Sequence, residues 1–202
     1  MAILCVFKAS CVRWHMNIRQ SFSRSARMLS NTRAITLAAM LVALHIALSS
    51  VRVQITPELR LTVGYVTQAA AGMLLGPVMA MLTGAVGDIV ALICFPSGAY
   101  FPGYTLTAAV GGLIYGLMLF GRPRVTYLRA LSTKALVNLV CNLFLNTLWL
   151  TMTSGQSMLA LLPVRAIKNL AMLPLEALLI YMTAGMVAVA ARRLHLFRGS
   201  RE

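Results

Sequence analysis

The chain has 202 residues, of which 59% are hydrophobic and only 11% are charged, and its mean hydropathy is +0.82. About a quarter of the residues of a soluble domain are charged, so this composition excludes a soluble globular protein and indicates a lipid bilayer. The net charge of +14 does not indicate nucleic-acid binding, because most basic residues flank apolar runs. We therefore expect membrane lipid as a partner and no nucleic acid.

The residue types that carry enzyme chemistry are scattered along the chain. Four cysteines and three histidines form no C-x-x-C pair and no ligand cluster, so we expect no metal site. The motifs H-E-x-x-H, G-x-S-x-G and G-x-x-x-x-G-K-[ST] are absent. We therefore expect no catalytic residues and no cofactor, and ATP would have to be hydrolysed by another chain.

Residues 1–31 are basic, rich in serine and free of acidic side chains. We predict that they form a disordered cytoplasmic leader. The same composition also fits an organellar transit peptide. A further interpretation is that translation begins at Met16 or Met28.

Long apolar runs predict membrane-spanning helices, since a span needs about 20 mostly apolar residues and must satisfy its own backbone hydrogen bonds. The first is expected over residues 32–50. The second, shorter one should run from residue 59 or 61 to residue 76, after the loop V-R-V-Q-I-T-P-E-L-R. Gly76 followed by Pro77 is a helix stop and start, so the third helix should cover residues 77–95.

Turn residues separate the remaining helices. The run F-P-S-G-A-Y-F-P-G-Y over residues 95–104 predicts a loop, and the fourth helix should continue to about residue 120. After the basic turn G-R-P-R, the fifth helix is expected over residues 127–151 and the sixth over residues 162–191.

The predicted fold class is an all-α integral membrane protein, with a six-helix domain over residues 32–191 and a basic tail over residues 192–202. Six spans place both termini on one side, and both are basic. The positive-inside rule then predicts a multi-pass protein of the cell membrane with both termini in the cytoplasm. Only four of the 18 Lys and Arg residues remain for the outward side, namely Arg52, Arg60, Arg165 and Lys168.

These outward cations admit two interpretations. Arg165 and Lys168 are three residues apart and share one helix face, and Arg60 lies at the mouth of the second helix. Their long side chains could simply reach the membrane interface. Alternatively, they form a positive rim that binds the carboxylates of an anionic ligand through charge-assisted hydrogen bonds.

Asp88 is the only charged residue in the long apolar block between residues 61 and 121. Acidic side chains within spans are costly and usually face a cavity or a partner. Asp88 could pair with Lys168, Arg165 or a helical amide, or it could accept two parallel N–H groups from a heterocyclic ligand. Glu176 presents the same choice, and we interpret it as structural.

Aromatic and amide side chains gather near the same predicted end. Asn138, Asn142 and Asn146 recur every four residues and should face protein or a cavity, although hydrogen bonding between helices alone could explain them. Trp149 could stack on a planar ligand or anchor in the interface. The loop residues that accompany them are Phe95, Pro96, Tyr100, Phe101, Pro102 and Tyr104.

Small residues line one side of the first helix and predict a close helix contact, either internal or with a partner protein. They are Ala34, Ala38, Ala39, Ala43 and Ala47. The glycine pairs of the second and fourth helices are interpreted as internal packing. They are Gly72 and Gly76, and Gly112 and Gly116.

Four runs of the sequence carry a family resemblance. They are R-L-T-V-G-Y-V-T-Q-A-A-A-G-M-L-L-G-P (60–77), G-D-I-V-A-L-I-C-F-P-S-G-A-Y-F-P-G-Y-T-L-T-A-A-V-G-G-L-I-Y-G-L (87–117), L-N-T-L-W-L (145–150) and V-R-A-I-K-N-L-A-M-L-P-L (164–175). In this order they resemble the folate-family substrate-binding (S) components of energy-coupling-factor (ECF) transporters. The similarity covers about residues 32–190. Where the family commonly has proline, this chain has Thr67 followed by Gln68.

The resemblance implies a subunit that binds folate or a related vitamin and joins a transmembrane coupling protein and two ATP-binding cassette ATPases. It implies that Ala34, Ala38, Ala39 and Ala43 form the docking face. The implied ligand-binding residues are Arg60, Tyr65, Asp88, Phe95, Pro96, Tyr100, Phe101, Tyr104, Asn146, Trp149, Arg165 and Lys168.

Our hypothesis is that Asp88 binds a pterin ring among the loop aromatics, while Arg60, Arg165 and Lys168 bind the glutamate tail. One alternative is an S component for a different vitamin. Another is a self-sufficient channel or secondary carrier, which should show internal repeats that this sequence lacks.

Overall fold

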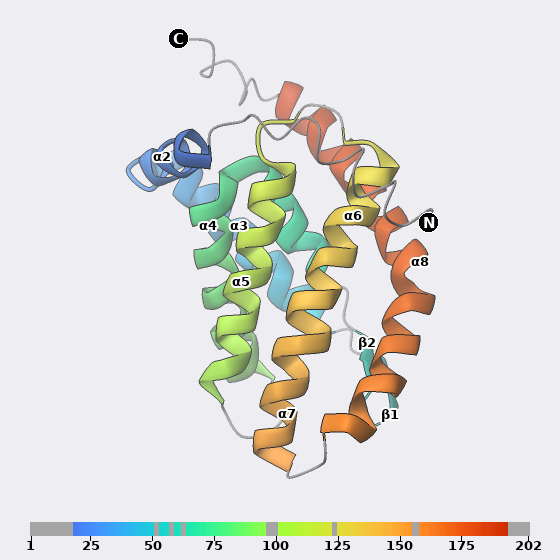
Figure 1. Ribbon diagram of the computed structural model, residues 1–202. Coiled ribbons are helices and arrows are strands. Elements are labelled where there is room, and N and C mark those ends of the chain that lie inside the picture. Colours follow the sequence, from blue (N-terminus) through green and yellow to red (C-terminus); the bar gives the residue numbers. More distant parts are fainter. Residues whose placement is uncertain are drawn as a thin grey trace.

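The computed structural model describes residues 18–50, 53–56, 59–61, 64–95, 101–122, 125–154 and 158–193. These residues form a bundle of membrane-spanning helices, one crosswise helix and one short hairpin (Figure 1). The elements are α2 (Ile18–Met28), α3 (Thr32–Ser50), β1 (Val53–Thr56), β2 (Leu59–Leu61), α4 (Tyr65–Cys94), α5 (Pro102–Leu119), α6 (Tyr127–Val137), the π-helix η1 (Asn138–Leu145), α7 (Asn146–Ser154) and α8 (Met158–Arg193).

The six predicted spans are present, although five described helices are long and apolar enough to cross a membrane. The difference arises in α4, whose range covers two helical segments that are separated by a non-helical residue, Gly76 (φ 80°, ψ −177°). The chain reverses direction there, since the Gln68 amide approaches Gly84 from the other half of α4. Only glycine adopts that backbone conformation freely, and Pro77 starts the next helix. The predicted stop and start is therefore confirmed.

The bundle has two distinct ends. At one end, which we call the α2 end, lie α2 and the last turns of α8 (Figure 1). At the other, the hairpin end, α4 ends, α5 begins, α7 ends and α8 begins, and the β1–β2 hairpin lies nearby (Figure 1). The first described helix and the C-terminal end of the last one thus lie at the same end of the bundle, as six spans require (Figure 1).

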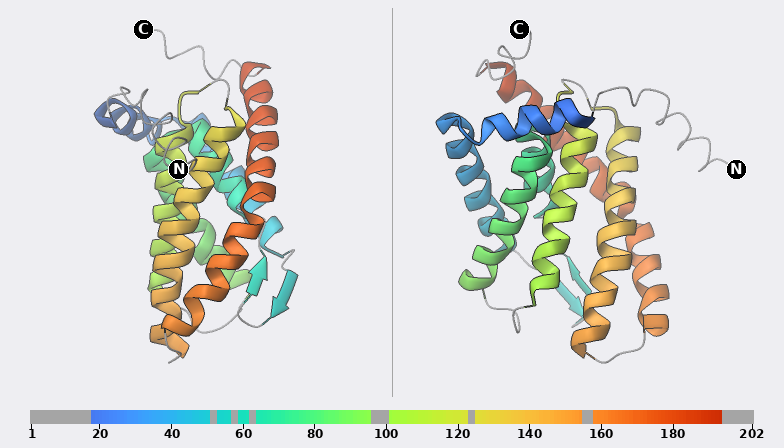
Figure 2. Two further views of the ribbon diagram at one scale, coloured as in Figure 1. Left: turned by 45° about the vertical axis from the view of Figure 1, so that its right-hand side comes forward. Right: turned by 60° about the vertical axis from the view of Figure 1, so that its left-hand side comes forward.

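Helix α2 contradicts the prediction of a disordered leader for the part of it that the structure describes. The helix lies crosswise over the α2 end of the bundle (Figure 2). The buried Ser25 hydroxyl donates to the Leu75 carbonyl at 2.8 Å and accepts from the backbone N–H groups of Val78 (3.1 Å) and Met79 (3.2 Å). The break in α4 leaves these backbone groups without helical partners, and Ser25 supplies the missing cap from another helix.

The hairpin also differs from the prediction, because Leu59 and Leu61 belong to β2 and not to the second helix. Strand β2 pairs antiparallel with β1, with Val53 opposite Leu61 and Gln54 opposite Arg60. The ladder satisfies backbone groups that would otherwise lack partners. The helical part of the second span is consequently short, about 18 Å from Tyr65 to Gly76 at 1.5 Å per residue.

Glycines let α4 and α5 approach closely, as predicted. A Cβ atom on Gly72 would lie 2.7 Å from the Gly116 nitrogen, and one on Gly116 would collide with Pro77. Gly112 packs in the same way on the backbone of Ala80. Substitution of any of these glycines would force the helices apart.

The alanines of α3 that are predicted to form the docking face differ in their exposure. Ala34 and Ala38 are buried against Leu75 and Met79 of α4, so they serve internal packing. Ala39 and Ala43 are exposed on α3. Only the second pair is available to a partner protein.

The last two spans are longer than predicted. The fifth reaches Ser154, and the sixth begins at Met158 and ends at Arg193. The remainder of the predicted tail, residues 194–202, lies outside the described residues.

We predict that Ser25→Ala lowers the free energy of unfolding by about 1–2 kcal/mol, because it removes a cap and leaves buried backbone groups without a partner. Unfolding in mixed detergent micelles measures this effect. The matched control is Ser23→Ala, which alters an exposed serine of the same helix and should change little. Equal stability of the two variants would refute the capping role.

Candidate functional site

Four of the predicted ligand residues lie in the part of the bundle next to the hairpin end, and we call this part the ligand layer. At 1.5 Å per residue, Asp88 lies about 9 Å from the end of α4, and Asn146 about 12 Å from the end of α7. Arg165 and Lys168 lie about 10 and 15 Å along α8. Three separate helices therefore carry these residues within about 15 Å of their ends at the hairpin end.

An aromatic cluster lies beside this layer. The ring centroids of Phe101 and Trp149 are 5.5 Å apart, and those of Phe101 and Tyr104 are 6.1 Å apart with nearly perpendicular planes. The Trp149 indole N–H donates to the Thr107 hydroxyl at 3.0 Å. Trp149 is thus held against α5 by packing and by a hydrogen bond, which fixes the orientation of its ring.

Asp88 accepts a hydrogen bond from the Thr105 hydroxyl at 2.9 Å and is partly exposed. Among the described residues it forms no ion pair with Arg165 or Lys168, so the predicted pairing is not observed there. One carboxylate oxygen is held by α5, and a carboxylate can accept several further hydrogen bonds.

The cationic residues are only partly described. Arg165 and Lys168 are half-buried on α8, and Arg60 lies in β2, where only its backbone is described. Phe95 follows the last residue of α4 and is exposed. Pro96 and Tyr100 lie outside the described residues.

A buried ion pair lies deeper in the bundle. The Lys134 ammonium is 3.5 Å from the Glu176 carboxylate, and their side chains are 2% and 16% exposed. Lys134 also lies 3.8 Å from the ring centroid of Tyr65, close enough for a cation–π interaction. The sequence predicts a structural role for Glu176 but no partner for it, and the structure supplies Lys134 as that partner.

The asparagine stripe connects the ion pair to the ligand layer. The Asn138 amide donates to Glu176 at 3.1 Å, Asn142 donates to Asn138 at 2.8 Å, and Asn146 donates to Asn142 at 3.4 Å. We call these three residues the asparagine ladder. Lys134 continues the same four-residue spacing, and this was the sequence signal that could have found it.

The π-helix η1 keeps the asparagine ladder on one face. Four residues of an α-helix turn about 400°, so positions four apart drift by about 40° at each step. The wider turn of η1, which contains Asn138 and Asn142, counters that drift. The ladder therefore stays aligned from Glu176 to Asn146.

A second polar contact that the sequence did not predict joins α3 to α4. The His45 ring nitrogen Nδ1 lies 2.9 Å from the Thr67 hydroxyl and 3.2 Å from the Gly64 carbonyl oxygen. Gln68 donates to the Ala108 carbonyl of α5 at 3.3 Å. Thr67 and Gln68, where the family commonly has proline, thus form contacts that hold the start of α4.

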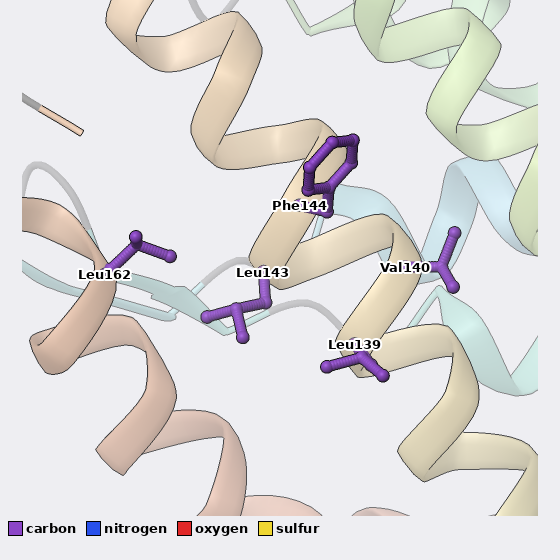
Figure 3. Close-up of a pocket in the computed structure, with 5 residues that line it drawn as sticks. All are labelled: Leu139, Val140, Leu143, Phe144 and Leu162. Atoms are coloured by element: carbon purple, nitrogen blue, oxygen red, sulfur yellow. The ribbon is translucent and has the colours of Figure 1, made fainter. Parts of the chain in front are cut away.

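An open cleft of about 390 Å³ lies between η1 and α8, away from these polar groups. Leu143 extends from η1 toward Leu162 of α8 (Figure 3). The lining is entirely hydrophobic, and Phe144 is 60% exposed. Ligand sites need a few polar groups to orient the ligand, and this cleft has none, so we assign it to membrane lipid.

The fold defines a multi-pass membrane protein with polar and aromatic side chains near one end of its bundle. Residues 33–184 match the family model described as ECF transporter, substrate-specific component. The chain belongs to this family.

Two relatives of this chain are named folate transporter FolT. The chain is 37% identical over 126 residues to FolT of Clostridium novyi, covering 62% of this chain and 73% of that protein. It is 36% identical over 151 residues to FolT of Leuconostoc mesenteroides, covering 72% and 81%. The crystal structure of FolT bound with folic acid matches with a TM-score of 0.71 and 29% identity, covering 77% of this chain and 95% of that one.

Proposed function

We propose that this chain is the membrane-embedded, folate-binding subunit of an ATP-driven ECF uptake transporter and is not an enzyme. One observation carries the proposal. A carboxylate, an aromatic cluster, an amide and two cations occur toward the hairpin end of a bundle that resembles FolT bound with folic acid, and this supports the proposal. Folate needs this combination, because its ring donates hydrogen bonds and its tail carries carboxylates.

The proposed assignments follow from the chemistry of each group. Asp88 accepts N–H groups of the pterin ring, while Thr105 orients the carboxylate. Trp149 and Phe101 pack against the ring face. Arg165 and Lys168, with Arg60 of the hairpin, bind the carboxylates of the glutamate tail.

The orientation and the partners belong to the same proposal. Most basic residues of the described part of the chain lie at the α2 end, which supports a cytoplasmic α2 end and a site that opens outward. A transmembrane coupling protein then docks on the exposed small residues of α3, Ala39 and Ala43, and two ATPases supply the energy. Ala34 and Ala38 are excluded from this face because they pack against α4.

The ligand assignment predicts two separate losses of affinity. Asp88→Asn should weaken folate binding to the purified protein by about 10-fold or more, since hydrogen bonds to charged groups contribute about 1.5–3 kcal/mol. Arg165→Ala combined with Lys168→Ala should weaken folate but should affect a pterin without the glutamate tail much less. Binding of tritiated folate measures both.

The control for this experiment is Arg33→Ala, which removes an exposed cation at the opposite end of the bundle and should not alter affinity. Unchanged affinity in Asp88→Asn and in the double variant would refute the assignment. Failure of the unaltered protein to bind folate, with binding of another vitamin, would instead refute the choice of ligand.

The docking face yields a different prediction. Ala43→Trp should abolish folate uptake by the assembled transporter in liposomes while folate binding to the isolated chain persists, because the bulky ring blocks helix contact. Ala190→Trp, at an exposed position of α8, is the control. Normal ATP-driven uptake by Ala43→Trp would show that the coupling protein docks elsewhere.

A further inference from the structure

The bonds of the asparagine ladder all point in one direction. An ionised carboxylate only accepts hydrogen bonds, so the Asn138 group facing Glu176 must be its NH2. The Asn138 oxygen then faces the Asn142 nitrogen, and the Asn142 oxygen faces the Asn146 nitrogen. The carboxylate therefore fixes the orientation of all three amides, with each oxygen directed toward the hairpin end.

Packing between helices does not explain the whole ladder. Asn138 bonds to Glu176 on α8, which is a contact between helices. Asn142 and Asn146 each donate to the amide four residues earlier on their own polypeptide segment, so these bonds join no second helix. Two amides in an apolar span are costly and need another reason to be there.

The last oxygen of the asparagine ladder supplies that reason. Among the described residues, the Asn146 side-chain oxygen accepts no hydrogen bond. Asn146 lies three residues before Trp149, so the two side chains are neighbours on the helix. Hydrogen bonds in a chain polarise one another, so the carboxylate at the far end makes this oxygen a stronger acceptor.

Asn146 and Trp149 are already among the ligand residues that the sequence resemblance implies. We infer that Glu176 and Lys134 orient the Asn146 oxygen so that it accepts a hydrogen bond from the exocyclic amino group of a planar ligand stacked at Trp149. Glu176 and Lys134 act as positioning residues: they orient and polarise the asparagine ladder without touching the ligand. The site therefore selects heterocycles with an amino donor over those with a carbonyl or a methyl group at that position. This inference rests on the proposed function, since the pterin ring of folate carries such an amino group.

The test compares folate with an analogue whose exocyclic amino group is replaced by methyl. The quantity measured is the ratio of their dissociation constants, which a merely structural defect would leave unchanged. One variant combines Lys134→Met with Glu176→Gln, which removes the charge but retains an acceptor for Asn138 and leaves no unpaired ion. The second is Asn142→Leu, which interrupts the ladder and keeps the ion pair. The control is Thr183→Val, which alters a hydroxyl bonded only within α8.

We expect the unaltered protein and Thr183→Val to bind folate about 10-fold more tightly than the methyl analogue. In both ladder variants this ratio should fall by a factor of about three or more. Melting curves without ligand identify variants that remain folded, and either folded variant decides the test. An unchanged ratio in a folded ladder variant overturns the inference and leaves folate binding intact as a function. Absence of folate binding in the unaltered protein overturns the proposed function itself.

Discussion

The interior of this protein depends on one buried ion pair, Lys134 with Glu176. Charges within a bilayer are costly unless they are paired and hydrogen-bonded. Removal of either member of this pair would leave the other as an uncompensated buried charge. The pair joins α6 to α8, the ring of Tyr65 brings in the start of α4, and Asn138 adds η1. One interaction thus joins α6, α8, η1 and the start of α4.

The irregular segments of the bundle are explained by the same need to satisfy polar groups in an apolar medium. Gly76 reverses the chain, and Ser25 of α2 caps both sides of the break. The π-helix η1 holds the asparagine ladder in line, and the hairpin pairs backbone that does not continue as helix. At each of these departures from a regular span, the polar groups have named hydrogen-bond partners.

Much of the architecture was predictable from the sequence, because apolar runs and turn residues act locally. The Gly76–Pro77 break, the spans and the gathering of Asp88 and Trp149 near one end follow from such signals. The role of Ser25 was not predictable, since it caps a break 50 residues away and lies before the region matched by the family model. The four-residue spacing with the asparagines marks Lys134 in the sequence, but its pairing with Glu176 was not predictable, because it depends on the packing of α6 against α8.

The most direct measurement of the central claim is a double-mutant cycle on Lys134 and Glu176, read as the free energy of unfolding in mixed micelles. We predict that Lys134→Met and Glu176→Gln each cost about 3 kcal/mol, because each leaves an uncompensated buried partner, and that the double variant costs much less than the sum. A strictly additive cycle would show that the two side chains do not interact energetically. In that case the ion pair could not be the interaction that organises the bundle.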